Sequence, residues 1–187
     1  MGKMYEAIDA DHQAFIERQS MFFVGSAPLA ASGHVNLSPK GLDAFRVIDK
    51  ATVMYLDLTG SGNETAAHLV ENGRLTIMFC AFEGNPKILR LYCRGRVLTR
   101  LTPDWTEALA RFPVMPGVRQ IVVAHVESVQ TSCGFGVPRY TFEQQRDQLP
   151  RWAEHRGEAG MVDYRRTRNA VSLDGLLSPA TDPDSTP

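Results

Sequence analysis

Short apolar stretches with strand character follow one another through most of the chain, and their close spacing restricts the fold more than any other feature. About six or seven such stretches are indicated, among them residues 21–27, 75–82, 88–98 and 119–130. Most neighbouring stretches are too close for a crossover helix between them, so antiparallel pairing is expected. A long antiparallel sheet tends to close or to fold over on itself. The sequence therefore predicts a mainly β protein, an antiparallel barrel with flanking helices.

Four segments have the features of helices, at residues 8–19, 63–71, 102 to about 112, and 142–155 with a kink at Pro150. The stretch 34–38 is expected to be a strand that ends at Pro39. A chain of 187 residues fits one domain. We therefore expect a single domain over residues 1–178, with a C-terminal helical extension. Residues 179–187 are rich in Pro, Asp and Ser, which predicts a disordered tail.

The composition is that of an ordinary soluble protein, with 43% hydrophobic and 22% charged residues. A net charge of -1 argues against a nucleic-acid partner. The sequence has neither an apolar run of membrane-spanning length nor a signal peptide, so no membrane association is expected. Cys80, Cys93 and Cys133 are widely spaced, which indicates reduced thiols in a cytoplasmic protein. The five histidines are dispersed, and no metal site is expected.

Residues 53–71 form the most informative local pattern. An apolar run at 53–56 predicts a buried strand, and the small residues 59–63 predict a turn that leads into a helix. Gly60 and Gly62 would allow positive φ angles there. Backbone N–H groups of such a turn, at the open N-terminus of a helix, favour an anion. We therefore expect a phosphate at this turn.

A second interpretation of the same turn involves no ligand. Ser61 and Glu64 have the spacing of a capping box, in which their side chains would simply begin the helix. The turn is not a dinucleotide fingerprint, since the third glycine is missing, and it has no P-loop lysine. Both the phosphate and the capping interpretation remain open at this point.

The stretch 34–38 alternates strictly between polar and apolar residues. His34, Asn36 and Ser38 point to one side, and Val35 and Leu37 to the other. The polar side either faces water or lines a polar ligand, and the sequence does not decide between them. Lys40, just beyond, could meet a phosphate.

These stretches, in this order, resemble the pyridoxamine phosphate oxidase-like superfamily of flavin-binding split barrels. The similar segments are residues 33–41, 55–65, 78–82 and 132–138. The resemblance implies a homodimer of split β-barrels with FMN in two grooves at the interface, and side chains of 78–82 that come from the other subunit. The cofactor-binding residues it implies are His34, Asn36, Ser38, Lys40, Asp57, Thr59, Ser61, Gly62, Asn63 and Thr65.

The expected activity is that of an FMN-dependent oxidoreductase acting on an unidentified small molecule. The C-terminal residues 169–176 do not align with the Trp and paired Arg segment of the oxidases that make pyridoxal phosphate, so vitamin B6 oxidation is not expected. No catalytic residue is indicated, and His68 is expected to be a core residue. The alternatives are a deazaflavin-dependent reductase, a non-catalytic flavin- or haem-binding protein, and a barrel that has lost its cofactor.

Overall fold

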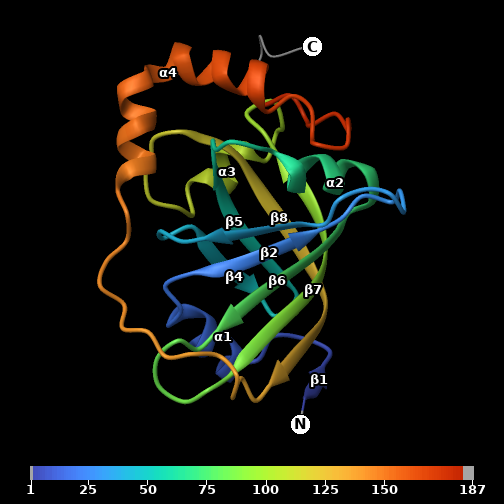
Figure 1. Cartoon of the computed structure of the whole chain (residues 1–187), viewed down its shortest axis with the longest axis vertical. Coiled ribbons are helices and arrows are strands. Elements are labelled where there is room, and N and C mark those ends of the chain that lie inside the picture. Colours follow the sequence, from blue (N-terminus) through green and yellow to red (C-terminus); the bar gives the residue numbers. More distant parts are fainter. Residues whose placement is uncertain (1, 183–187) are drawn as a thin grey trace.

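The strands of the computed structural model join one antiparallel sheet (Figure 1), and the structure describes residues 2–182. Over this range there are eight strands: β1 (Lys3–Tyr5), β2 (Phe22–Ser26), β3 (Asn36–Lys40), β4 (Phe45–Asp49), β5 (Thr52–Leu58), β6 (Arg74–Cys80), β7 (Ile88–Leu98) and β8 (Val118–Ser132). The four helices are α1 (Ala10–Glu17), α2 (Glu64–Asn72), α3 (Trp105–Leu109) and α4 (Gln148–Arg168). The mainly β architecture with flanking helices is confirmed.

The sheet has the order β3-β2-β6-β7-β8-β5-β4, so β3 and β4 are its two edges and it does not close completely. The long strand β8 joins its halves. It pairs with β7 on one side, and on the other side with β5 and then with β1. This is the predicted split barrel.

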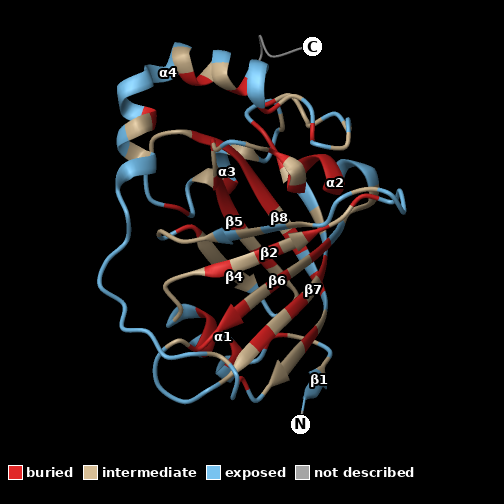
Figure 2. Ribbon diagram, viewed as in Figure 1, coloured by how far each residue is buried: buried red, intermediate tan, exposed pale blue. Residues whose placement is uncertain are grey.

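Two apolar clusters stabilise the sheet (Figure 2). The larger one combines residues of α1 and α2 with residues of β2 and of β5 to β8, and the smaller one includes Ala108 of α3 and Leu56. Strand β5 contributes to both, because Val53 and Tyr55 enter the larger cluster while Leu56 enters the smaller. Burial on both faces explains why residues 53–56 are continuously apolar.

Three of the predicted helices lie where the sequence placed them, with different ends. Helix α1 begins after Asp9, whose side chain accepts a hydrogen bond from the His12 N–H. Helix α2 ends at Asn72 and is followed by Gly73, whose φ of 71° is typical of a residue that terminates a helix. Helix α3 ends at Leu109, before the expected Phe112.

The boundaries of β3 and α4 differ from the predictions. β3 continues through Pro39 to Lys40, which is tolerated because β3 is an edge strand. α4 begins at Gln148, so the predicted helix over 142–147 is wrong. Its break lies at Gly157, where φ is 66° and ψ is 171°, and not at Pro150. Pro150 lies in the first turn, where its missing N–H costs no hydrogen bond.

After α4 the chain folds back through a bridge between Val171 and Leu177. Of the segment expected to be a disordered tail, residues 179–182 are described, and Thr181 and Asp182 are buried there. Residues 183–187 lie outside the described residues. No helix within the described range is long and apolar enough to span a bilayer. The three cysteines, all in this range, are free thiols.

Candidate functional site

An open groove of about 2070 Å³ runs along the barrel. One end is formed by the β5–α2 loop, residues 59–63, and by the start of α2. The other end is formed by a segment without regular structure before α4, residues 139–147, which we call the strap. Strand β3 lies along the groove between the two ends. A concave groove of this size, lined by convergent polar side chains, is the candidate site.

The polar side of β3 faces this groove. Asn36, Ser38 and Lys40 line it and are half-buried. The apolar side chains on the other side, Val35 and Leu37, are 77% and 65% exposed. The alternation of this strand is therefore inverted relative to an ordinary surface strand, in which the polar side chains face water.

A buried ionic cluster lies where β5 enters the loop. Asp57 is 3% exposed. Its carboxylate accepts hydrogen bonds from Lys40 Nζ at 2.5 Å, from Arg119 Nε at 2.8 Å and from Gln120 Nε2 at 2.7 Å. Gln120 is the cross-strand partner of Asp57, and a β-bulge follows directly. The sheet register thus brings together charges that are 62 residues apart in the chain.

Asp57 remains ionised in this cluster. Burial by itself raises the pKa of a carboxyl, but the charges of Arg119 and Lys40, with their hydrogen bonds, hold the pKa of Asp57 well below its usual range. Two cations thus share one buried carboxylate. The cluster carries a net charge of about +1, from two cations and one anion, beside the groove.

The β5–α2 loop leaves the N-terminus of α2 without a side-chain cap. Asn63 is the N-cap residue but makes no capping hydrogen bond, and its Oδ1 instead accepts from Gln120 Nε2 at 2.7 Å. Glu64 Oε2 accepts from the Leu173 N–H at 2.9 Å. A capping box between Ser61 and Glu64 is therefore not the function of this turn, and the helix dipole is open to the groove.

Gly60 and Gly62 do not have the positive φ angles that the sequence suggested. Both line the groove together with Ser61. A Cβ atom at Gly60 would meet no atom within 4 Å. The absence of a side chain here leaves the backbone accessible from the groove, which is the other reason for glycine in a binding loop.

Most of the residues implied as cofactor-binding lie together at the groove: Asn36, Ser38, Lys40, Asp57, Ser61, Gly62 and Thr65. Thr65 Oγ1 accepts a hydrogen bond from Asn36 Nδ2 at 3.0 Å, which joins α2 to β3. His34, Thr59 and Asn63 do not line the groove. His34 is exposed and its Nδ1 lies 2.7 Å from Asp174 Oδ1, whereas Thr59 and Asn63, at the two ends of the loop, are buried.

Three residues of the site were not predicted, namely Arg119 and Gln145, which line the groove, and the buried Gln120. Arg119 and Gln120 interrupt a run of Val and Ile in β8, and this interruption was a usable signal for a polar site. Gln145, in the strap, accepts from the Leu42 N–H at 2.9 Å and donates to the Ser20 carbonyl at 2.7 Å. Nothing in the sequence indicates this role, because Gln145 is more than 100 residues from Leu42.

His68 is buried and its Nδ1 lies 3.0 Å from Ser26 Oγ, as expected for a core histidine. Within residues 2–182, no group of three or more His, Cys, Asp or Glu side chains is arranged to hold a metal ion.

Comparisons with known proteins agree with this architecture. Residues 8–133 match the family model described as pyridoxamine 5'-phosphate oxidase. The chain is 39% identical to the pyridoxamine 5'-phosphate oxidase family protein ustO of Aspergillus flavus, over 92% of this chain and 76% of that protein.

Two crystal structures are similar in fold. One is HupZ from Group A Streptococcus, which is 20% identical with a TM-score of 0.52, over 67% of this chain and 99% of that chain. The other is described as a putative pyridoxamine 5'-phosphate oxidase from Lactobacillus delbrueckii, which is 15% identical with a TM-score of 0.52, over 67% of this chain and 94% of that chain. With its fold, its groove and the match over 8–133, the chain belongs to the pyridoxamine 5'-phosphate oxidase family.

Proposed function

We propose that this protein binds FMN in the groove, with the phosphate at the β5–α2 loop, and acts as a cytoplasmic oxidoreductase on a small molecule. The observation that carries the proposal is the conjunction at one end of the groove of an uncapped helix N-terminus with the Asp57 cluster. Each feature alone is common in proteins. Together they provide the electrostatics that a terminal phosphate requires.

The residues present fit a phosphorylated flavin. Lys40 and Arg119 carry two positive charges, and Asp57 neutralises only one of them. Both cationic residues line the groove. Ser61 adds an exposed hydroxyl on the loop. Further along the groove, the amide of Asn36 and the hydroxyl of Ser38 offer both donors and acceptors, which suits the ribityl chain and the polar edge of a ring.

FMN would supply the hydride or electron transfer, while the protein binds it and orients it. Lys40 and the loop would bind the phosphate, and β3 would hold the ribityl chain along its polar side. Pockets for small ligands commonly measure roughly 300–1,000 Å³. A groove of about 2070 Å³ leaves room at the strap end for a substrate beside the cofactor.

The proposal includes a homodimer. The exposed Val35 and Leu37 lie on the outer side of the edge strand β3. Exposed apolar residues on an edge strand favour aggregation unless another surface covers them. A second copy of the chain would cover this side and would complete the groove that the same strand lines.

The test is the absorbance spectrum of the purified protein, followed by heat release and mass spectrometry of any cofactor. We expect a flavin spectrum and about one FMN per chain. A colourless protein that takes up no added FMN would contradict the proposal, and release of a deazaflavin would replace FMN as its cofactor. Anaerobic addition of NADPH and of other electron donors then tests the activity. An oxidoreductase is expected to lose its flavin absorbance on reduction by a donor, whereas a binding protein is expected to keep it with every donor.

A further inference from the structure

We propose that the C-terminal segment, residues 165–182, holds the β5–α2 loop in its phosphate-binding conformation, with Arg165 and Asn169 as positioning residues. The inference rests on the proposed function and extends it to a part of the chain that lies outside the matched residues 8–133. Neither side chain lines the groove. Both act on the loop from behind.

Asn169, at the C-terminus of α4, joins the two components of the phosphate end. Its side chain is buried, and Oδ1 accepts from Arg119 Nη1 at 2.9 Å. Its Nδ2 donates to the Gly60 carbonyl at 3.0 Å. Arg119 Nη1 also donates to the Gly62 carbonyl at 2.7 Å. One amide thus fixes a loop carbonyl and a cation of the Asp57 cluster relative to each other.

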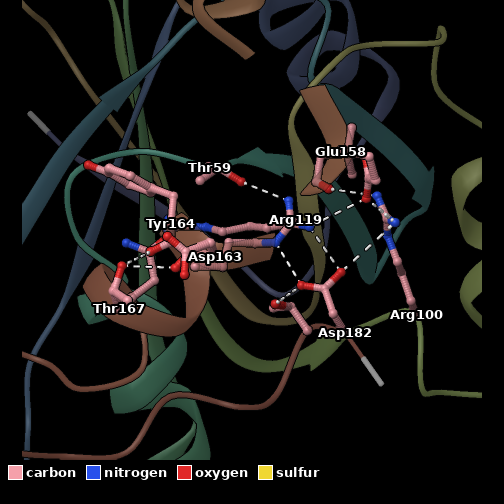
Figure 3. A network of polar contacts seen from close by, with 12 residues as sticks. Thr59, Arg100, Arg119, Glu158, Asp163, Tyr164, Thr167 and Asp182 are labelled. Carbon is pink, nitrogen blue, oxygen red and sulfur yellow. Dashed lines mark hydrogen bonds and ion pairs between the residues drawn. The ribbon is translucent and has the colours of Figure 1, made fainter. Parts of the chain in front are cut away.

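Arg165 forms the second connection. It is 3% exposed, and its Nη1 donates to Thr59 Oγ1 at 3.4 Å at the start of the loop. Asp182 holds this guanidinium by two hydrogen bonds, from Nε at 2.7 Å and from Nη2 at 3.0 Å. Glu158 Oε1 lies 3.5 Å from Arg165 Nη2, and Figure 3 shows Asp182 with Glu158 and Arg100 beside it. Because a buried cation needs a buried anion, the position of Arg165 depends on Asp182.

Two further hydrogen bonds extend the same connection along the loop. Ser178 Oγ donates to the Asn63 carbonyl at 3.4 Å, and the Leu173 N–H donates to Glu64 Oε2 at 2.9 Å. The second bond engages Glu64, a carboxylate in the first turn of α2 that would otherwise repel a phosphate. Residues 59, 60, 63 and 64 are therefore all held by the C-terminal segment.

Such contacts couple the docking of the C-terminal segment to ligand binding. If the loop binds phosphate only in this conformation, then loss of the contacts lowers phosphate affinity, and bound phosphate in turn stabilises the docked segment. The effect must be specific for ligands that carry the phosphate. Riboflavin, which lacks it, provides the control ligand.

The experiment is a fluorescence titration of FMN and of riboflavin into the full-length protein and into Asn169→Ala. Loss of two hydrogen bonds is expected to weaken FMN binding about tenfold, with riboflavin binding changed by less than about twofold. Arg166→Ala is the matched control, since Arg166 is an exposed residue of α4 that pairs with Asp163. We expect this control to leave both affinities unchanged.

Asp182→Asn, which keeps the shape of the side chain, should weaken FMN binding in the same selective way. An equal loss for both ligands in the two variants, or no loss for either, would overturn the inference while the proposed function stands. If the wild-type protein binds no FMN, the proposed function and this inference are both wrong. Should a variant not fold, hydrogen exchange of the wild type decides, because FMN should slow exchange in residues 165–182 and unchanged exchange would overturn the inference.

Discussion

The two ends of the groove are built in opposite ways. At the loop end, Asp57 and Arg119 are 3% and 6% exposed. Asp57 accepts hydrogen bonds from side chains of β3 and β8, and Arg119 donates to Asp57, to the Gly62 carbonyl and to Asn169. At the strap end, Tyr140 and Phe142 are 63% and 48% exposed. The strap is exposed along its length (Figure 2), and it is held by few polar contacts, including those of Gln145.

This difference indicates how one groove can bind two different ligands. A preorganised, charged end suits a chemical group that never changes, and a cofactor phosphate is such a group. An exposed segment with few contacts opens at low cost and tolerates sequence change, which suits the group that differs between relatives, the substrate.

Asp57→Asn should have the largest effect, because it leaves the buried Arg119 and the half-buried Lys40 without their anion. Breaking a buried ion pair costs about 3–5 kcal/mol, so we expect a loss of that order in the free energy of unfolding, measured by urea denaturation. Asp43→Asn is the control, since Asp43 pairs with Arg46 at the surface, where such pairs contribute about 0–1 kcal/mol. Equal losses in both variants would contradict the central role of Asp57.

The pH dependence of the free energy of unfolding should show the contribution of the Asp57 carboxylate. The folded-state pKa of Asp57 lies below its unfolded value of about 3.9. Its contribution is therefore complete above that value and is lost as the pH falls below it, towards the folded-state pKa. Denaturation of wild type and Asp57→Asn between about pH 2 and 7 should give a shallower acid loss in the variant, and parallel curves would refute this assignment.

Lys40→Gln and Lys87→Gln compare the same substitution at the two ends. Lys40 lies beside Asp57 in the loop end, and Lys87 lines the strap end with its Nζ 4.7 Å from the centre of the Phe15 ring. Loss of a charge-assisted hydrogen bond should weaken FMN binding about tenfold or more in Lys40→Gln. Lys87→Gln should change it less than about twofold. Equal effects, measured by fluorescence titration, would remove the distinction between the ends.

Gln145→Ala should have the smallest effect on the cofactor. It removes two hydrogen bonds that attach the strap to Leu42 and Ser20, so the strap should be cleaved faster in limited proteolysis. FMN affinity should remain within about twofold of wild type, because each bond contributes only about 0.5–1.5 kcal/mol and neither reaches the loop. A large loss of FMN affinity would place the cofactor at the strap end instead.

The sequence predicts those features that depend on neighbouring residues. β7 spans residues 88–98 as expected, because polar and apolar residues alternate along most of its length, and the β5–α2 loop follows from local turn chemistry. The uncapped N-terminus of α2 was not predictable, because the side chains of Asn63 and Glu64 accept hydrogen bonds from Gln120 and Leu173 instead of capping the helix.

What the sequence could not predict depends on contacts distant in the chain. Asp57 meets Arg119 through sheet register, and residues 142–147 have helix-forming composition but are held as a strap by Gln145. The composition of residues 179–187 indicates disorder, yet Asp182 is buried because Arg165 needs a counter-charge. In each case a tertiary partner overrides the local preference.

The most direct test of the central claim is a comparison of FMN with riboflavin as ligands of the wild-type protein. The two differ only in the phosphate, so the difference in affinity measures what the β5–α2 loop contributes. We predict that FMN binds at least about tenfold more tightly, and that added salt reduces this advantage because it screens the charges. Equal affinities would contradict a phosphate site at the loop.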